Sequence, residues 1–261
     1  MLNRILIRVV VSMLCVAWVS LPAQAMIISP TYVDGSGQTW DATRMGVIQQ
    51  AIDDWQSLIL DEQTINITFD FTNAGSSGYL AQWAGSFSVL KGTDLYPWTP
   101  GVTHTISFNA DFFTGSHYTW WDPTPATSED QPSAAFDALS VARHELGHAL
   151  GFADNFYYDN FSTIDSIDKW TSHITETTFD PGGLDVSMAS ASNLSHVLDG
   201  GETAGDLMVP ALPNGMRRDI STTDLNMLQL AYGYQLVPEP STLVLLVIGV
   251  VGVWGVARRR R

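Results

Sequence analysis

Hydrophobic residues follow two different periods along this chain, and the two periods predict a mixed α+β fold. Residues 65–71 alternate strictly between hydrophobic and polar, which is the pattern of a strand with one buried face. Shorter runs of the same kind predict that the first half of the chain supplies most of a sheet. We expect strands at residues 26–33, 65–71, 78–90 and 102–108.

Hydrophobic residues at three- and four-residue spacing predict three helices. The first has Asp41 as its cap, the second stops at Gly151, and the third opens at Ser221, which is followed by an acidic residue three positions later as in a capping box. The helices cover residues 41–59, 136–150 and 221–232.

Two segments show no period. Residues 109–133 are rich in tryptophan and proline, and we interpret them as a loop that packs on the surface. Residues 155–192 form a longer irregular stretch, which is often functional in a compact domain. His104 in the predicted strand at 102–108 and His117 in the loop are isolated histidines, and we interpret both as hydrogen-bonded structural residues.

The first 25 residues have the composition of a secretory signal. Two arginines precede an apolar run, and small residues at positions 23 and 25 form a cleavage site. The chain has a single cysteine, Cys15, which lies inside this segment. The exported part therefore cannot contain a disulfide, and its stability must come from its core and from bound metal.

The C-terminus carries a second address signal. Pro238, Glu239 and Pro240 precede an apolar run at 243–257 and four arginines at 258–261. This order resembles the PEP-CTERM sorting signal of Gram-negative bacteria. The resemblance implies an exosortase as partner, transient anchoring in the inner membrane through this segment alone, and a final place at the cell surface or outside the cell. We expect a signal at 1–25, one folded domain at 26–236 and the sorting segment at 237–261.

The central segment is strongly acidic. Of the 12 Lys and Arg residues six lie in the two end segments, whereas of the 27 Asp and Glu residues only Glu239 does, which leaves 26 acidic residues against six basic ones. Nucleic acid and anionic lipid are poor partners for such a surface. Cations are good ones, and the acidic, glycine-rich loops make a structural Ca²⁺ a further expectation, although the same acidity also favours solubility.

Residues 144–151, His-Glu-Leu-Gly-His-Ala-Leu-Gly, carry the strongest chemical signal. In a helix, the four-residue spacing puts His144 and His148 one turn apart on one face, where both imidazoles can bind one metal ion with Glu145 beside it. Hydrophobic residues at helical spacing bury this helix, which keeps such a site rigid. The pattern is typical of a zinc hydrolase.

The motif through Gly151 resembles that of the metzincin zinc metalloproteases, and Met208 resembles the methionine of the turn beneath their metal. The resemblance spans about residues 134–234. It implies an α+β fold in which a twisted mixed sheet backs the active-site helix, followed by a smaller, mostly irregular and helical C-terminal lobe. It also implies that an edge strand holds extended substrate, and we expect residues 78–83 at that edge.

Two residues compete for the role of third zinc ligand. Asp154 lies six residues after His148, where metzincins have His and some members Asp, but an Asp there can equally close a turn. His196 lies 12 residues before Met208, which resembles the leishmanolysin-like branch, where a long insertion precedes the third histidine. Because that insertion also accounts for residues 155–192, we favour His196 and keep Asp154 as the alternative.

These observations predict an exported zinc endopeptidase that hydrolyses protein or peptide substrates. Glu145 would act as general base on a water activated by Zn²⁺ and then pass the proton to the leaving amine. Met208 is expected to form an apolar floor and not to bind the metal. The alternative is a non-catalytic, metal-stabilised matrix or adhesion protein. Glu145 separates the two, because a structural zinc site closed by four ligands has no use for it.

Overall fold

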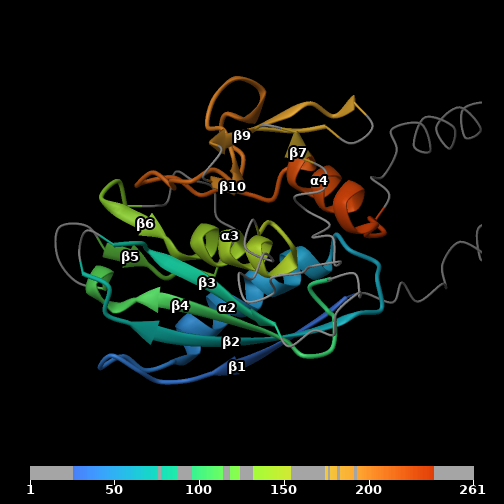
Figure 1. Cartoon of the computed structure of the whole chain (residues 1–261). Helices are drawn as coiled ribbons and strands as arrows, with labels where there is room; N and C mark the ends of the chain where they lie inside the picture. Colours follow the sequence, from blue (N-terminus) through green and yellow to red (C-terminus); the bar gives the residue numbers. More distant parts are fainter. Residues whose placement is uncertain are drawn as a thin grey trace, which may run out of the picture.

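A computed structural model of the chain describes residues 26–75, 78–87, 96–113, 118–123, 132–153, 174–175, 177–180, 183–190 and 193–237. Over these ranges the chain has a mixed α+β fold with three α-helices and three small sheets (Figure 1). The predicted signal at 1–25 and the sorting segment from residue 238 onwards lie outside them. Within the described part of the chain, no helix is long and apolar enough to span a bilayer.

The largest sheet of the N-terminal half contains the four predicted strands. They are β1 (Ile27–Tyr32), β2 (Thr64–Thr72), β3 (Ala81–Phe87) and β4 (Val102–Asn109), in the order β1-β2-β4-β3. Strands β1, β2 and β4 run parallel to one another, whereas β3 pairs antiparallel with β4 and forms one edge of the sheet. The expectation of an edge at residues 78–83 is therefore confirmed for the residues that open β3. Residues 88–90 of the predicted strand lie outside the described residues.

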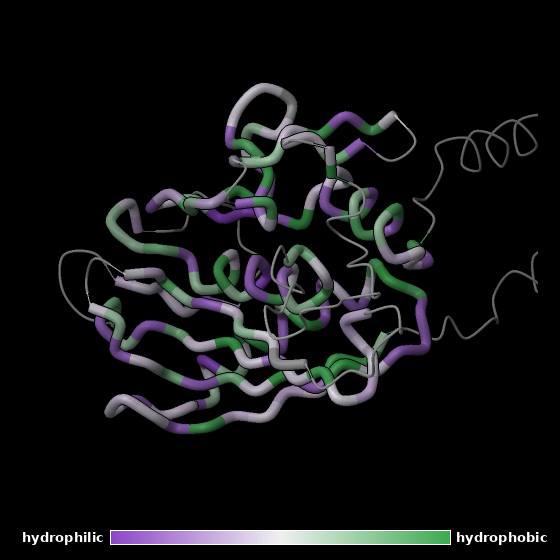
Figure 2. The backbone as a smooth tube through the Cα atoms, viewed as in Figure 1, coloured by the Kyte–Doolittle hydropathy of each residue, from purple (hydrophilic) through white to green (hydrophobic). Residues whose placement is uncertain are grey.

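Two helices, α2 (Ala42–Gln56) and α3 (Ala138–Leu150), pack together and against this sheet (Figure 1). Hydrophobic segments gather where the helices meet the sheet, and hydrophilic ones lie toward the outside (Figure 2). Trp55 is fully buried there, and its indole N–H donates to the carbonyl oxygen of Arg143 at 2.9 Å. The Arg143 guanidinium pairs with Asp54 at 2.7 Å, so α2 fixes the position of α3 from one side.

The first helix is shorter than predicted. It ends at Gln56, because the chain turns at Ser57, whose N–H donates to the carbonyl of Asp53. Ile59 keeps its buried place, but it does so in a β-bridge with Leu236. A hydrophobic residue at helical spacing is therefore compatible with an extended segment that returns to the same core.

The second helix begins later than predicted. Phe136 belongs to a short strand, β6 (Ala135–Asp137), which pairs parallel with β5 (Tyr118–Trp120). The carboxylate of Asp137 accepts a hydrogen bond from the N–H of Ser140 at 3.0 Å, and this cap starts α3 at residue 138.

The segment 109–133 is only partly a loop. It holds the 3₁₀ turn η1 (Ala110–Phe112) and strand β5, while residues 114–117, with His117, and 124–131 lie outside the described residues. Trp121 packs its ring on Phe108 and Phe113, with centroid distances of 5.0 and 5.6 Å. The interpretation of this segment as packed on the surface is confirmed for Trp121.

The C-terminal half contains a second four-stranded sheet that the sequence did not indicate. Its antiparallel strands have the order β10-β9-β8-β7, and the prediction of a mostly irregular and helical lobe is wrong for this part. Strands of two to five residues are too short to show a period, and they exist only because neighbours complete their hydrogen bonds. The strands are β7 (Ile174–Thr175), β8 (Thr178–Phe179), β9 (Val186–Ser190) and β10 (Asn193–Val197), followed by the 3₁₀ turn η5 (Gly201–Thr203).

The last helix, α4 (Thr222–Tyr232), matches its prediction. Ser221 and Asp224 form the expected capping box, and Gly233 ends the helix in a left-handed conformation. The hydroxyl of Tyr232 donates to the carbonyl of Gly151 at 2.8 Å, and that of Tyr234 donates to the carbonyl of Leu150 at 2.9 Å. The C-terminal end of α3 is thereby fixed as firmly as its start.

Candidate metal centre

Helix α3 presents His144 and His148 from a rigid position. All of its side chains are buried, and its N-terminal cap Asp137 also accepts hydrogen bonds from Arg217 at 2.8 and 3.0 Å. Arg143, one residue before the first histidine, pairs with Asp54 and with Asp219 at 2.7 Å each. The spacing of the two histidines on this helix therefore defines half of a metal site.

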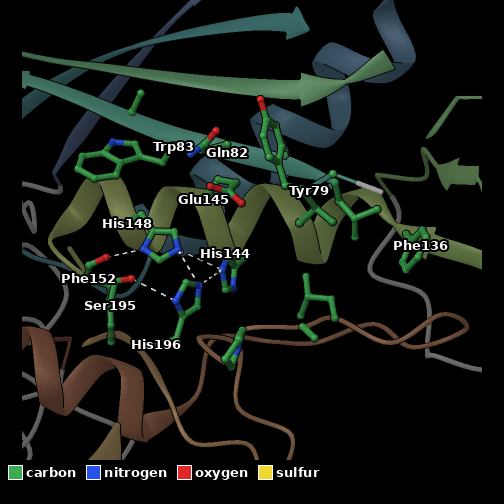
Figure 3. Close-up of a pocket in the computed structure, with 18 of the residues that line it drawn as sticks. Tyr79, Gln82, Trp83, Phe136, His144, Glu145, His148, Phe152, Ser195 and His196 are labelled. Carbon is green, nitrogen blue, oxygen red and sulfur yellow. Dashed lines mark hydrogen bonds between the residues drawn. The ribbon is translucent and has the colours of Figure 1, made fainter. Parts of the chain in front are cut away.

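His196 of β10 completes a triangle with these two residues (Figure 3). Its Nε2 atom lies 3.1 Å from Nε2 of His144 and 3.2 Å from Nε2 of His148, and the two helical Nε2 atoms are 3.1 Å apart. Asp154, the alternative third ligand, lies outside the described residues.

In each of the three rings, the hydrogen bond made by Nδ1, which points away from the triangle, determines whether Nε2 carries the proton. Nδ1 of His144 lies 2.8 Å from the carbonyl oxygen of Leu207, and Nδ1 of His148 contacts the carbonyl oxygen of Phe152. Nδ1 of His196 lies 2.5 Å from Oδ1 of Asn193. Because a carbonyl oxygen only accepts, the proton of each helical ring sits on Nδ1, and Nε2 carries a lone pair.

This triangle of nitrogens fits a metal ion. The Nε2 lone pairs of His144 and His148 face each other, and such groups are costly to bury without a partner. A cation between them supplies that partner. Tetrahedral zinc with bonds of about 2.0–2.1 Å would separate its nitrogen ligands by about 3.3–3.4 Å, close to the spacing of 3.1–3.2 Å found here.

Burial keeps the three histidines in the neutral form that binds metals. It lowers the pKa of His144 to about 4 and that of His196 to about 3, and it holds the pKa of His148 well below its usual value. The neighbouring imidazoles lower the pKa of His148 and His196 further. No proton has to be displaced from these rings at neutral pH before a metal binds.

Glu145 lies beside the two helical imidazoles, on the side that faces β3 (Figure 3). Burial raises the pKa of its carboxyl to about 8, against the opposing effect of a hydrogen bond from the backbone N–H of Trp83. A nearby dication would favour the charged carboxylate. A carboxyl group in this position is well suited to exchange a proton near neutral pH.

Residues 206–209 form hydrogen bonds with both elements that supply the histidines, helix α3 and strand β10. The carbonyl of Leu207 accepts from His144, and the carbonyl of Met208 accepts from the N–H of Val197 at 2.9 Å. Met208 itself is fully buried, and a Cβ atom added at Gly147 would lie only 2.5 Å from its sulfur. The close approach of this methionine to the helix therefore requires the glycine between the two helical histidines.

A cavity of about 650 Å³ opens onto the histidine triangle and Glu145. Residues 78–85 line it along β3, the edge strand of the first sheet. Apolar side chains also line it, among them Phe136, Val141 and Leu212. A bound metal ion would therefore be open to a ligand from solution.

The sequence did not single out Trp83, which the structure puts at this site. Its ring stacks on His148 with 6.3 Å between centroids, and its Nε1–H donates to Nδ1 of His104 at 3.1 Å. His104 in turn donates from Nε2 to the carbonyl of Pro97 at 2.8 Å, which confirms it as a structural residue. The available signal was the resemblance, because it put residues 78–83, and so Trp83, on the expected edge strand.

The expected structural Ca²⁺ was not tied to particular residues, and no carboxylate group is among the candidate metal sites of the described residues. Within the described ranges, the three histidines are the group of side chains that could hold a metal ion.

Comparison with known proteins identifies the C-terminal segment. Residues 236–261 match the family model of the PEP-CTERM protein-sorting motif. No curated protein matches the chain. The motif indicates export, processing by an exosortase and sorting to the cell surface, and the predicted address signal at this end is thereby confirmed. The chain is therefore an exported PEP-CTERM protein with a buried histidine triad that could bind a metal ion.

Proposed function

We propose that this chain is an exported zinc endopeptidase, with His144, His148 and His196 as metal ligands and Glu145 as general base. The observation that carries the proposal is the triangle of converging Nε2 atoms next to a buried carboxyl group in an open cavity. Zinc bound there would act as a Lewis acid and would lower the pKa of a water molecule towards neutrality.

The residues around the triangle fit peptide hydrolysis. Glu145 can accept a proton from the attacking water and return it to the leaving amine. Among the described residues β3 is an edge strand that borders the cavity, and it could pair through backbone groups other than the N–H of Trp83 with a substrate in extended conformation. Phe136, Val141 and Leu212 offer an apolar surface to a substrate side chain next to the scissile bond.

The same geometry argues against a purely structural metal. A structural zinc site is closed by four protein ligands, whereas three converge here among the described residues, on a cavity large enough for a peptide segment. A matrix or adhesion protein stabilised by metal would need neither the open position nor a carboxyl group beside it.

Glu145→Gln tests the proposal. The substitution keeps the shape of the side chain but removes the base, so hydrolysis of a quenched fluorescent peptide library should fall by about 10²–10⁴-fold. Zinc content, measured by mass spectrometry of the metal, should stay at the wild-type level, because the three ligands are untouched. Full activity in the variant would contradict the role of Glu145, and zinc-loaded wild-type protein without peptidase activity would favour the matrix protein.

A further inference from the structure

The three histidines of the triangle are oriented by different kinds of acceptor. His144 and His148 donate from Nδ1 to the peptide carbonyls of Leu207 and Phe152. His196 donates instead to a side chain, with 2.5 Å between its Nδ1 and Oδ1 of Asn193. A peptide carbonyl can only accept, whereas an Asn amide accepts on one side and donates on the other.

We propose that Asn193 is a positioning residue that selects the metal-binding tautomer and the ring orientation of His196. This inference rests on the proposed metal site and extends it, because it identifies the residue that leaves Nε2 of His196 able to bind a metal ion. With the amide oxygen toward the ring, the proton of His196 stays on Nδ1 and the lone pair of Nε2 points into the triangle. With the amide nitrogen toward the ring, Nδ1 would have to accept.

The second arrangement is incompatible with a ligand. The proton would then sit on Nε2, which lies 3.1 and 3.2 Å from the Nε2 atoms of the other two histidines. It would form a hydrogen bond within the triangle and occupy the direction in which a metal ion must bind. The orientation of a single amide group therefore decides whether two or three nitrogens are available.

Ser195 favours the productive orientation of the amide. Its hydroxyl donates to Oδ1 of Asn193 at 3.3 Å, and its oxygen lies 3.1 Å from Nδ1 of His196. The amide oxygen thus receives hydrogen bonds from the hydroxyl and from the ring. Asn193 is itself held in place by pairing with Ser190 of β9. Because the distance to Asn193 is the shorter one, we assign the control of the ring to the amide and a supporting part to Ser195.

Loss of such a hydrogen-bond partner behind a metal-binding histidine typically lowers metal affinity by about 10–100-fold. Asn193→Leu keeps the size of the side chain and removes the acceptor, so we expect a loss of that size. Asn193→Asp keeps an acceptor and removes the alternative orientation, so it should bind zinc at least as tightly as the wild type. Ser195→Ala leaves the amide oxygen in place and removes only the supporting hydroxyl, so it should lose less affinity than Asn193→Leu.

Two measurements test the proposal. In the metal-free exported domain, long-range ¹⁵N–¹H correlation spectra of labelled histidine report the tautomer of His196. We expect Nδ1–H in the wild type and in Asn193→Asp, and a population of Nε2–H that is larger in Asn193→Leu than in Ser195→Ala. Competition with a chromophoric chelator then gives the affinity for zinc, with about 10–100-fold weaker binding in Asn193→Leu and a smaller loss in Ser195→Ala.

Several outcomes would overturn the assignment. One is an Asn193→Leu protein with wild-type tautomer and affinity. Another is a change of tautomer in Ser195→Ala as large as that in Asn193→Leu, which would give control to the hydroxyl. Loss of zinc in Asn193→Asp would also contradict it, and this variant keeps the test valid if Asn193→Leu does not fold. Wild-type protein that binds no zinc would refute the proposed metal site, whereas the spectra of the metal-free protein would still report on Asn193.

Discussion

The two halves of the histidine triangle are held by different parts of the molecule and in different ways. His144 and His148 come from α3, a helix that is buried along its whole length and fixed at both ends by side chains of other elements. His196 comes from a five-residue strand of a small sheet and is partly exposed. The position of His144 and His148, the helical half of the triangle, is thus set by the main fold. The position of His196, the strand half, depends on local side chains.

Residues 206–209 hold the two halves in a fixed position relative to each other. Through Leu207 it accepts a hydrogen bond from the helical half, and through Met208 it accepts one from Val197, next to the histidine of the strand half. A change in this segment therefore acts on both halves, whereas a change at Asn193 acts on one. The comparison predicts that changes at the strand alter the affinity of the proposed metal site without disturbance of the helix.

The largest expected effect follows removal of a histidine from either half. His148→Ala and His196→Ala should each lower zinc affinity by more than the roughly 10–100-fold that loss of an outer hydrogen-bond partner costs, because a ligand itself is lost. Chelator competition measures both values, with Asp154→Ala as the control that should bind like the wild type. If Asp154→Ala lost zinc and His196→Ala kept it, the strand half would have no part in the site.

Disruption of the helical half should reduce stability as well. Gly151 has a φ of 133°, and a Cβ atom there would overlap the ring of Tyr232. Gly151→Ala should lower the free energy of unfolding by about 2–5 kcal/mol, since the left-handed backbone costs about 1–2 kcal/mol and overpacking about 1–3 kcal/mol. Urea denaturation measures the change.

The control for this prediction is Gly37→Ala. Gly37 also has a positive φ, of 73°, but an added Cβ atom would meet nothing within 4 Å. Its substitution should cost only the backbone part, about 1–2 kcal/mol. Equal losses at both positions would mean that the contact between Tyr232 and the end of α3 contributes nothing.

A smaller effect concerns pH and the segment that joins the two halves. Asp224 of α4 lies next to Asp206, and burial, together with this neighbouring carboxylate, raises its pKa from 3.8 to about 7 against the hydrogen bonds from Ser221. The folded chain therefore holds a proton here more tightly than the unfolded chain does, and stability falls as pH rises from about 4 to about 7.

Asp224→Asn should remove this dependence. Relative to the wild type, the free energy of unfolding of the metal-free variant should rise across that pH window, as followed by urea denaturation at several pH values. The exposed Asp199→Asn is the matched control and should show the pH profile of the wild type. Parallel profiles for Asp224→Asn and the wild type would refute the prediction.

The helical half could be predicted from the sequence because its determinants are local. The four-residue spacing of His144 and His148 defines a helix face, and the caps Asp41, Gly151 and Ser221 mark helix ends through interactions with near neighbours. The predicted helix boundaries were wrong at Phe136 and Ile59, because each is a hydrophobic residue at helical spacing that in fact lies in an extended segment.

The rest of the fold and of the site could not be predicted, because it depends on contacts between segments that are distant in the sequence. The strands β7, β8 and β9 are too short to have a period of their own. The carbonyl oxygens of Leu207 and Phe152, which fix the helical histidines, belong to the backbone and leave no trace in the residue types. His196 was favoured by resemblance to a family, whereas Asn193 gave no signal, because its role exists only when the strand is folded beside α3.

The central claim is that His144, His148 and His196 together hold a metal ion. Anomalous diffraction at the zinc edge from crystals of the exported domain tests this claim most directly. We predict one peak at about 2.0–2.1 Å from the Nε2 atoms of all three histidines. Absence of a peak from the triangle in zinc-soaked crystals, or a zinc ion held by Asp154 in place of His196, would contradict it.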